Sequence, residues 1–262
     1  MMFAYGDSDT PLDCCQEFMV ELIYQQLQVL IKESTELATI RKRNSIGYTE
    51  VLFQFRRHPI FIRRLIQYTR IHEVAPKLLN SAREDVLEVE DSEDIAPTIE
   101  PLDEKLTKGK TLFDAIREID ITGELISLFD VATTPDDLKV ERMRRLAART
   151  EKMDSEMYEQ FSNARMMSFC SKKGKKSMTL AKRFLEWLGS PKLDHGVVYV
   201  LNYCATEIVA VIVDSAVLVR EQEAKIFHDE FPTKSLQLRH YEEALRRNLG
   251  YARNKNVLFG YF

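Results

Sequence analysis

Turn-forming and cross-linking residues are scarce in this sequence. Its 262 residues include 9 Gly, 8 Pro and 4 Cys, and they contain no Asn-Gly, Asp-Gly or Gly-Gly pair. Tight hairpins favour those pairs, so their absence argues against an all-β protein, and the low content of Gly and Pro argues against a collagen-like one. The cysteines form no CxxC pair and the five histidines stand far from them. This spacing argues against a zinc finger and against a disulfide scaffold.

An excess of positive charge is also missing. Lys and Arg number 37 against 41 Asp and Glu, which gives a formal net charge of −4 and a pI near 5.9. A protein that grips nucleic acid over a broad face needs many basic side chains to displace counterions, so any DNA contact must be local. The first seven residues lack the basic region and apolar core of a signal peptide. We therefore expect a reducing compartment, the cytosol or the nucleus.

No long apolar run is free of polar residues. The longest, Val197–Val219, is interrupted by Asn202, Glu207 and Asp214. A membrane span there would bury two carboxylates, which is costly. The run therefore predicts a core helix, and we expect no membrane contact.

What the sequence does contain is helical periodicity. Apolar residues spaced by three and four predict one long helix over Asp13–Thr39, followed by a short segment at 51–55 and a short helix at 60–68. A similar short-long-short pattern appears at 183–189, 195–221 and 236–249. Between the two patterns we expect an amphipathic segment at 111–129, a continuous charged helix at 138–169 and a solvated turn at 172–176.

The two patterns are divided by an acidic segment. Glu84–Glu104 contains ten acidic residues, no Lys or Arg, and two prolines. Mutual repulsion and low apolar content predict a flexible linker. A long helix that is apolar on both sides needs a partner, so we expect the two units to cover each other. Placing both on one chain makes that pairing intramolecular and raises the effective concentration to the millimolar range.

Motifs that would indicate catalysis are absent. The sequence has no GxSxG, HExxH or GxGxxG, and no histidine or cysteine stands near a residue that would activate it. We predict no enzyme, no cofactor, no metal ion and no small-molecule substrate.

Several segments resemble one known family. The short-long-short pattern is similar to the histone fold, and the details resemble the Spt-three (suppressor of Ty) family of the SAGA transcription coactivator. The segments that carry this resemblance are the opening Met1–Asp7 with Pro11-Leu12, Glu50–Arg57, Asp120–Leu125, Met153–Phe161 with Ser168-Phe169, Phe184–Leu188, and Glu207–Asp214 through Val219-Arg220.

The resemblance implies an all-α protein in which two histone folds form an intramolecular pair. The implied divisions are a first histone fold of TAF-thirteen type with a truncated first helix at 1–79, the acidic linker at 80–110, a helical inter-fold region at 111–176, a second histone fold of TAF-eleven type at 177–250, and a C-terminal tail at 251–262. It further implies a nuclear, non-enzymatic coactivator subunit that binds TATA-binding protein and helps deliver it to promoters, with other SAGA subunits, including TAF-type histone-fold proteins, as partners. The alternative is a histone-fold pair that acts directly on duplex DNA.

Two groups of charged residues are candidate sites. Glu207, Asp214 and Glu221 recur every seven residues and form one polar seam on the long apolar helix. The simple interpretation is the solvent side of a buried helix. The functional interpretation, which comes from the resemblance, is a protein-binding surface that steers the basic face of TATA-binding protein.

The second group is basic. Residues 40–72 contain eight Lys or Arg against one acid. In a histone fold the loop before the third helix meets DNA phosphates, so the resemblance makes this group a DNA patch. A solvated face, or a patch for an acidic partner such as this chain's own linker, is favoured over DNA. The residues concerned are Arg41, Lys42, Arg43, Arg56 and Arg57.

Overall fold

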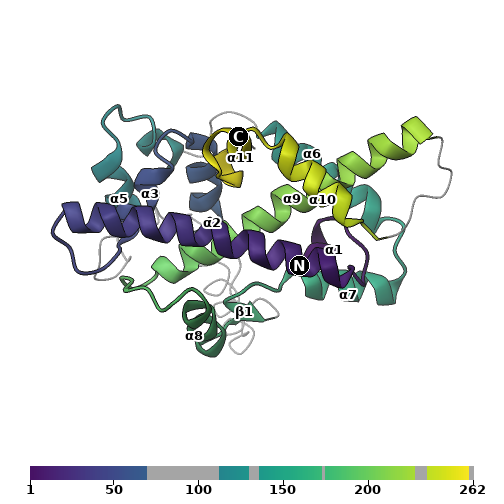
Figure 1. Ribbon diagram of the computed structural model, residues 1–262, viewed down its shortest axis with the longest axis horizontal. Coiled ribbons are helices and arrows are strands. Elements are labelled where there is room, and N and C mark those ends of the chain that lie inside the picture. The colour runs from purple at the N-terminus through teal and green to yellow at the C-terminus, as the bar shows by residue number, and fades with distance from the viewer. Residues whose placement is uncertain (70–111, 130–135, 173–174, 228–234, 260–262) are drawn as a thin grey trace, which may run out of the picture.

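The computed structural model describes residues 1–69, 112–129, 136–172, 175–227 and 235–259. Within them the regular secondary structure is helical apart from one antiparallel pair of short strands (Figure 1), which confirms the predicted all-α class. Residues 59–69 are helical. The other elements are α1 (Met2–Tyr5), α2 (Asp13–Ile40), α3 (Tyr48–Gln54), α5 (Leu112–Ile119), η1 (Ile126–Phe129), α6 (Asp137–Thr150), α7 (Ser155–Arg165), β1 (Ser171–Lys172), β2 (Lys175–Lys176), α8 (Met178–Trp187), α9 (Val197–Phe227), α10 (Leu238–Arg247), α11 (Leu249–Asn254) and η2 (Val257–Phe259).

The two long helices, α2 and α9, pack against each other and cross near the middle of the molecule (Figure 1). Their apolar residues belong to one continuous core, which also takes in α3, α5, α8 and α10. Ile23 and Leu27 on α2 and Ile212 on α9 are at most 1% exposed. Mutual covering of two apolar helices is what an intramolecular histone-fold pair requires, and that pairing remains our interpretation of the arrangement.

Loops tie the N-terminal and C-terminal segments together at both ends of α2. Beyond its C-terminus, Ile46 forms a parallel bridge with Leu193: the Ile46 amide donates to Lys192 O at 2.9 Å and the Asp194 amide donates to Ile46 O at 2.8 Å. Before its N-terminus, the buried Asp7 carboxylate accepts from the Leu236 amide at 2.9 Å and the Tyr241 hydroxyl at 2.7 Å. The crossing angle of the long helices is therefore held from both ends.

Helix α9 is long and apolar enough, by length and composition, to cross a membrane. However, 83% of its most apolar stretch is buried inside the protein. Packing against α1, α2 and α10 accounts for this composition, as the core-helix prediction requires.

Three details differ from the sequence-based expectations. The charged helix expected over 138–169 is divided, because the Asp154 carboxylate caps a new helix by accepting from the Met157 amide at 2.8 Å. The helix expected over 236–249 ends at Arg247, and Asn248 then caps α11. The residues expected to form a tail from 251 onward join the core as far as η2, where Val257 is fully buried.

The C-terminal segment is attached to α2 by hydrogen bonds from one side chain. Gln26 donates to Lys255 O at 2.9 Å and accepts from the Val257 amide at 2.8 Å. The ring of Phe259 stacks on His58 at 4.4 Å. The acidic segment predicted as a linker at 80–110 lies outside the described residues, and the predicted divisions at 79, 110, 176 and 250 remain predictions.

Ile212→Asp tests whether the two units fold as one. Ile212 is fully buried at the centre of α9, and an unpaired charge there should cost on the order of 4–5 kcal/mol of unfolding free energy. We expect both halves to lose structure together in urea titrations followed by circular dichroism. Leu218→Asp is the matched control, because Leu218 lies on the same helix and is 38% exposed. An N-terminal half that melts separately and intact would contradict intrachain pairing.

Candidate functional site

The acidic seam of α9 is mostly buried. Glu207 is 8% exposed and Asp214 is 4% exposed, whereas Glu221, two turns further on, is exposed. The simple interpretation of the seam as the solvent side of the helix is therefore wrong for its first two members. Burying a carboxylate is costly unless a cation is supplied, and arginines from two other elements supply it.

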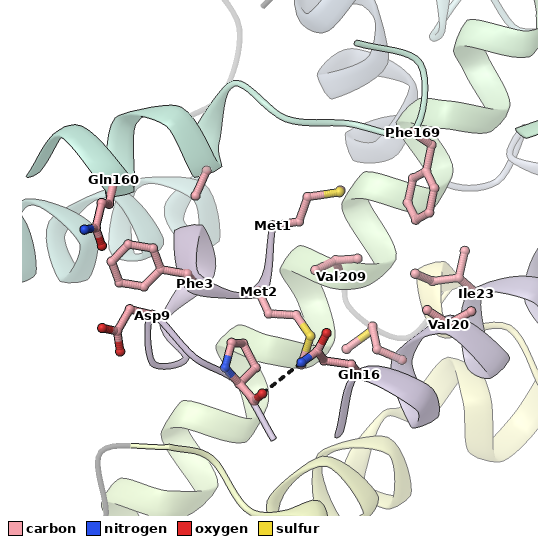
Figure 2. Close-up of a pocket in the computed structure, with 13 residues that line it drawn as sticks. Met1, Met2, Phe3, Asp9, Gln16, Val20, Ile23, Gln160, Phe169 and Val209 are labelled. Carbon is pink, nitrogen blue, oxygen red and sulfur yellow. Dashed lines mark hydrogen bonds between the residues drawn. The ribbon is translucent and has the colours of Figure 1, made fainter. Parts of the chain in front are cut away.

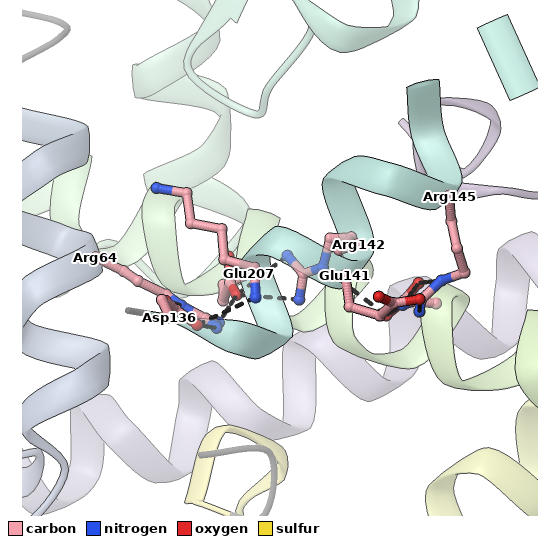
Figure 3. A network of polar contacts seen from close by, with 8 residues as sticks. Arg64, Asp136, Glu141, Arg142, Arg145 and Glu207 are labelled. Carbon is pink, nitrogen blue, oxygen red and sulfur yellow. Dashed lines mark hydrogen bonds and ion pairs between the residues drawn. The ribbon is translucent and has the colours of Figure 1, made fainter. Parts of the chain in front are cut away.

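Glu207 is held by two arginines. Arg64, from the helix at 59–69, donates from Nη1 to Glu207 Oε1 at 3.0 Å, and Arg142 of α6 donates to the same oxygen at 3.4 Å. Arg64 also donates two hydrogen bonds to Asp136, at 2.5 Å from Nε and 2.6 Å from Nη2. These four side chains form one network that joins the helix at 59–69 to α6 and α9 (Figure 3).

Asp214 is held by the next arginine on the same face of α6. Arg145 Nη2 donates to both oxygens of Asp214, at 2.7 and 2.6 Å, and its Nε lies 3.2 Å from Oδ1. Figure 3 shows Arg142 between Glu207 and Arg145, and the Nε atom of Arg142 lies 3.9 Å from Asp214 Oδ2. The two buried carboxylates are thus bridged by one helix.

The ends of α6 are attached in the same way. Near its N-terminus Lys139 donates to Gln67 Oε1 at 2.7 Å. Near its C-terminus Arg149 donates to the carbonyl oxygens of Phe3 at 2.8 Å and Asp7 at 2.5 Å, and its guanidinium lies over the Phe3 ring at 4.9 Å. The basic face of α6 therefore contacts the helix at 59–69 at one end, α9 in the middle and α1 at the other end.

Sequence reasoning missed these partners. The basic side chains at 142, 145 and 149 follow helical spacing, so the shared face was visible in the sequence. Their acceptors lie 65 to 146 residues away along the chain, and no local pattern shows that distance being closed.

Electrostatics at the network favour the charged forms. Burial alone would raise the pKa of Asp136. Hydrogen bonds from Arg64 and the Lys139 amide, together with the charges of Arg64 and Arg63, outweigh this effect, so the pKa of Asp136 lies below its ordinary value. Burial, with the charge of Glu207, raises the pKa of Tyr203 well above its ordinary value. The tyrosine therefore stays neutral at neutral pH.

The predicted basic patch is largely committed to internal contacts. Arg41 pairs with Glu50 at 2.7 Å and with Glu118, and Arg43 pairs with Asp194 at 2.5 Å. Arg56 donates to Phe53 O at 2.7 Å and lies over the Phe53 ring at 3.8 Å. Lys42 and Arg57 are exposed. The five residues thus do not form one open cationic surface.

A pocket of about 450 Å³ opens between α1, α2, α7 and α9 (Figure 2). Met1, Met2, Met19 and Phe169 are among its apolar lining residues. Among the described residues, the lining includes one acidic side chain, Asp9, and Gln16 is held by a 2.9 Å hydrogen bond to Pro11 O. Such a lining suits an apolar side chain.

Cysteine and metal chemistry have little support in the described residues. They contain no cluster of three His, Cys, Asp or Glu side chains that would hold a metal ion. Cys14 is exposed, and the other three thiols are buried. Burial raises the pKa of Cys170 to about 12, so that thiol is protonated at neutral pH and a poor nucleophile.

Asp136→Asn tests the pairing of Asp136 with Arg64. Asparagine keeps the helix cap, so the variant isolates the lost charge, and we expect it to cost roughly 1.5–3 kcal/mol at pH 7. Because the folded-state pKa of Asp136 is lowered, the stabilisation is complete above the unfolded pKa, near 3.9, and is lost as pH falls through the folded pKa. Urea unfolding between pH 7 and pH 3 should show the difference from wild type shrinking.

The control for this prediction is Asp137→Asn. Asp137 is the next residue and is exposed, so its replacement should change stability little at any pH. A gap between wild type and Asp136→Asn that stays constant down to pH 3 would remove the ion pair as its cause.

Comparison with known proteins finds similarity over most of the chain. The family described as transcription initiation factor IID, 18 kD subunit, matches residues 1–84. The chain is 26% identical over 238 residues to "SAGA complex subunit Spt3" of Schizosaccharomyces pombe, covering 86% of this chain and 73% of that protein. It is 24% identical over 221 residues to "SAGA complex subunit Spt3" of Drosophila melanogaster, covering 84% of this chain and 51% of that protein.

Proposed function

Because this chain belongs to the Spt3 family of histone-fold proteins, we propose that it is a non-enzymatic subunit of a SAGA-type coactivator complex in the nucleus. In this role it binds TATA-binding protein and helps deliver it to promoters. The observation that carries the proposal is the extent of the similarity: two relatives with the same name align over 84% and 86% of the chain. The chain spans about half of the length of the second relative.

The architecture supports a role as a scaffold. The long helices α2 and α9 share one core with the shorter helices, and loop contacts hold both ends of α2. Such a body keeps the helices of this core in fixed relative positions. Binding surfaces on a rigid body lose little conformational entropy when a partner docks.

Within this function, Glu221 is the member of the acidic seam that a basic partner can reach directly, because it is exposed on α9. Exposed charge raises association rates more than it raises affinity. Glu207 and Asp214 already have arginine partners inside the chain. They become available to a partner only where those arginines withdraw.

The alternative function, direct action on duplex DNA, has less support. DNA binding requires cations that can be offered to phosphates. Arg41 and Arg43, the centre of the predicted patch, are paired with carboxylates of the same chain. A patch whose charge is neutralised internally makes a weak phosphate-binding surface.

Purification of the tagged full chain from nuclear extract of its source organism tests membership of the complex. We expect mass spectrometry to identify SAGA subunits, including TAF-type histone-fold proteins, in the purified material. The Ile212→Asp variant, which should lose the folded core, is the control for nonspecific capture. Recovery of the wild-type chain without any coactivator subunit would contradict the proposal.

Glu221→Lys tests the steering of TATA-binding protein. Reversing one exposed charge should slow association severalfold at low salt while leaving the dissociation rate nearly unchanged. Surface plasmon resonance at 50 mM and 300 mM NaCl measures both rates. Glu159→Lys changes the net charge equally at an exposed position of α7 and should have a smaller effect. Equal slowing by both variants would remove Glu221 from the binding surface.

A further inference from the structure

Helix α6 is attached to the protein differently from the core helices. Arg142 is its one buried residue. Three of its four large apolar side chains, Leu138, Val140 and Met143, are 44 to 49% exposed, and the fourth, Leu146, is half-buried. Its attachments described above are instead made by charged side chains: Lys139, Arg142, Arg145 and Arg149.

Because these contacts are charged, we expect the attachment of α6 to its seat, the surface formed by α9 and its neighbours, to be weak and to depend on salt. Core helices gain about 25 cal/mol per Å² of buried apolar area, and α6 fully buries no apolar side chain. Partly exposed ion pairs contribute little, and buried ones are offset by desolvation. Arg145 is 25% exposed and lies within reach of solvent ions, which screen its attraction to Asp214.

We infer that α6 is a releasable strap, which leaves its seat on α9 as one unit while the core of α2 and α9 stays folded. In the seated state its arginines neutralise Glu207 and Asp214. In the released state Asp214 loses both Arg142 and Arg145, whereas Glu207 keeps Arg64. Release therefore changes the charge presented by α9 without unfolding it.

The strap has a consequence that rests on the proposed function. A basic partner that approaches α9 must compete with the arginines of α6 for the same carboxylates. When the binding-competent form of a protein is only partly populated, its apparent affinity falls by that fraction. The seated strap therefore lowers the affinity of the free chain for TATA-binding protein, and weakening the strap raises it.

Hydrogen–deuterium exchange of the full chain, followed by mass spectrometry, tests the strap itself. Raising NaCl from 50 to 500 mM should speed amide exchange in peptides from 137–150 by roughly tenfold or more, while peptides from α2 and α9 stay protected. Arg145→Gln should show fast exchange in α6 already at 50 mM. The matched control is Arg144→Gln: Arg144 is on the same helix, its side chain is 74% exposed, and it contacts Glu141 of α6.

Two results would overturn the strap. One is exchange in α6 that does not respond to salt or to Arg145→Gln. The other is loss of protection in α6 and α9 together, which would make α6 part of the core. Should Arg145→Gln disturb the core, Arg149→Gln removes the bonds to the Phe3 and Asp7 carbonyls instead and should free the same helix.

Affinity for purified TATA-binding protein tests the competition separately. Arg145→Gln should bind severalfold more tightly than wild type at 50 mM NaCl, and Arg144→Gln should bind as wild type does. Equal affinity in all three chains would refute competition. No binding by any of them would refute that part of the proposed function, and the exchange measurement would still decide whether α6 is a strap.

Discussion

The apolar surface of α9 is the constraint on which the rest of the structure depends. A helix of 31 residues that is apolar on several sides is unstable when exposed to water, because each exposed Å² of apolar surface carries a free-energy cost. Its neighbours α1, α2 and α10 remove that surface from solvent. The crossing of α2 and α9, and the ties between loops at both ends of α2, follow from the need to cover one helix from several directions.

Carboxylates inside this apolar environment impose a second constraint. Glu207 and Asp214 lie on a helix that is otherwise packed, so they must be either solvated or paired. The chain pairs them, with Arg64 from the first unit and with Arg142 and Arg145 from α6. A surface that would attract a basic partner is thereby used first within the chain. This arrangement links the middle segment to both units through charge instead of apolar packing.

Apolar contacts hold the core helices together and charged contacts hold α6, so the two parts differ in stability. The core of α2, α9 and α10 depends on burial, which salt does not weaken. The seat of α6 depends on ion pairs, which salt and competing charges do weaken. The core therefore keeps its shape under ionic conditions that weaken the contacts of α6.

Periodicity and composition alone were enough to predict the helical class and the long helices over 13–39 and 195–221, because these depend on local spacing. The resemblance to a family could also be recognised from short segments. The partners of the acidic seam on α9 could not be predicted. Whether Glu207 faces water or an arginine depends on residues 65 and 143 positions away, and the sequence does not encode that proximity locally. The same holds for Arg41 and Arg43, whose carboxylate partners include residues of other elements. Local chemistry determined which residues are charged and which segments are helical; only the packing of distant helices decided which charges meet, because pairing is a property of separation in space.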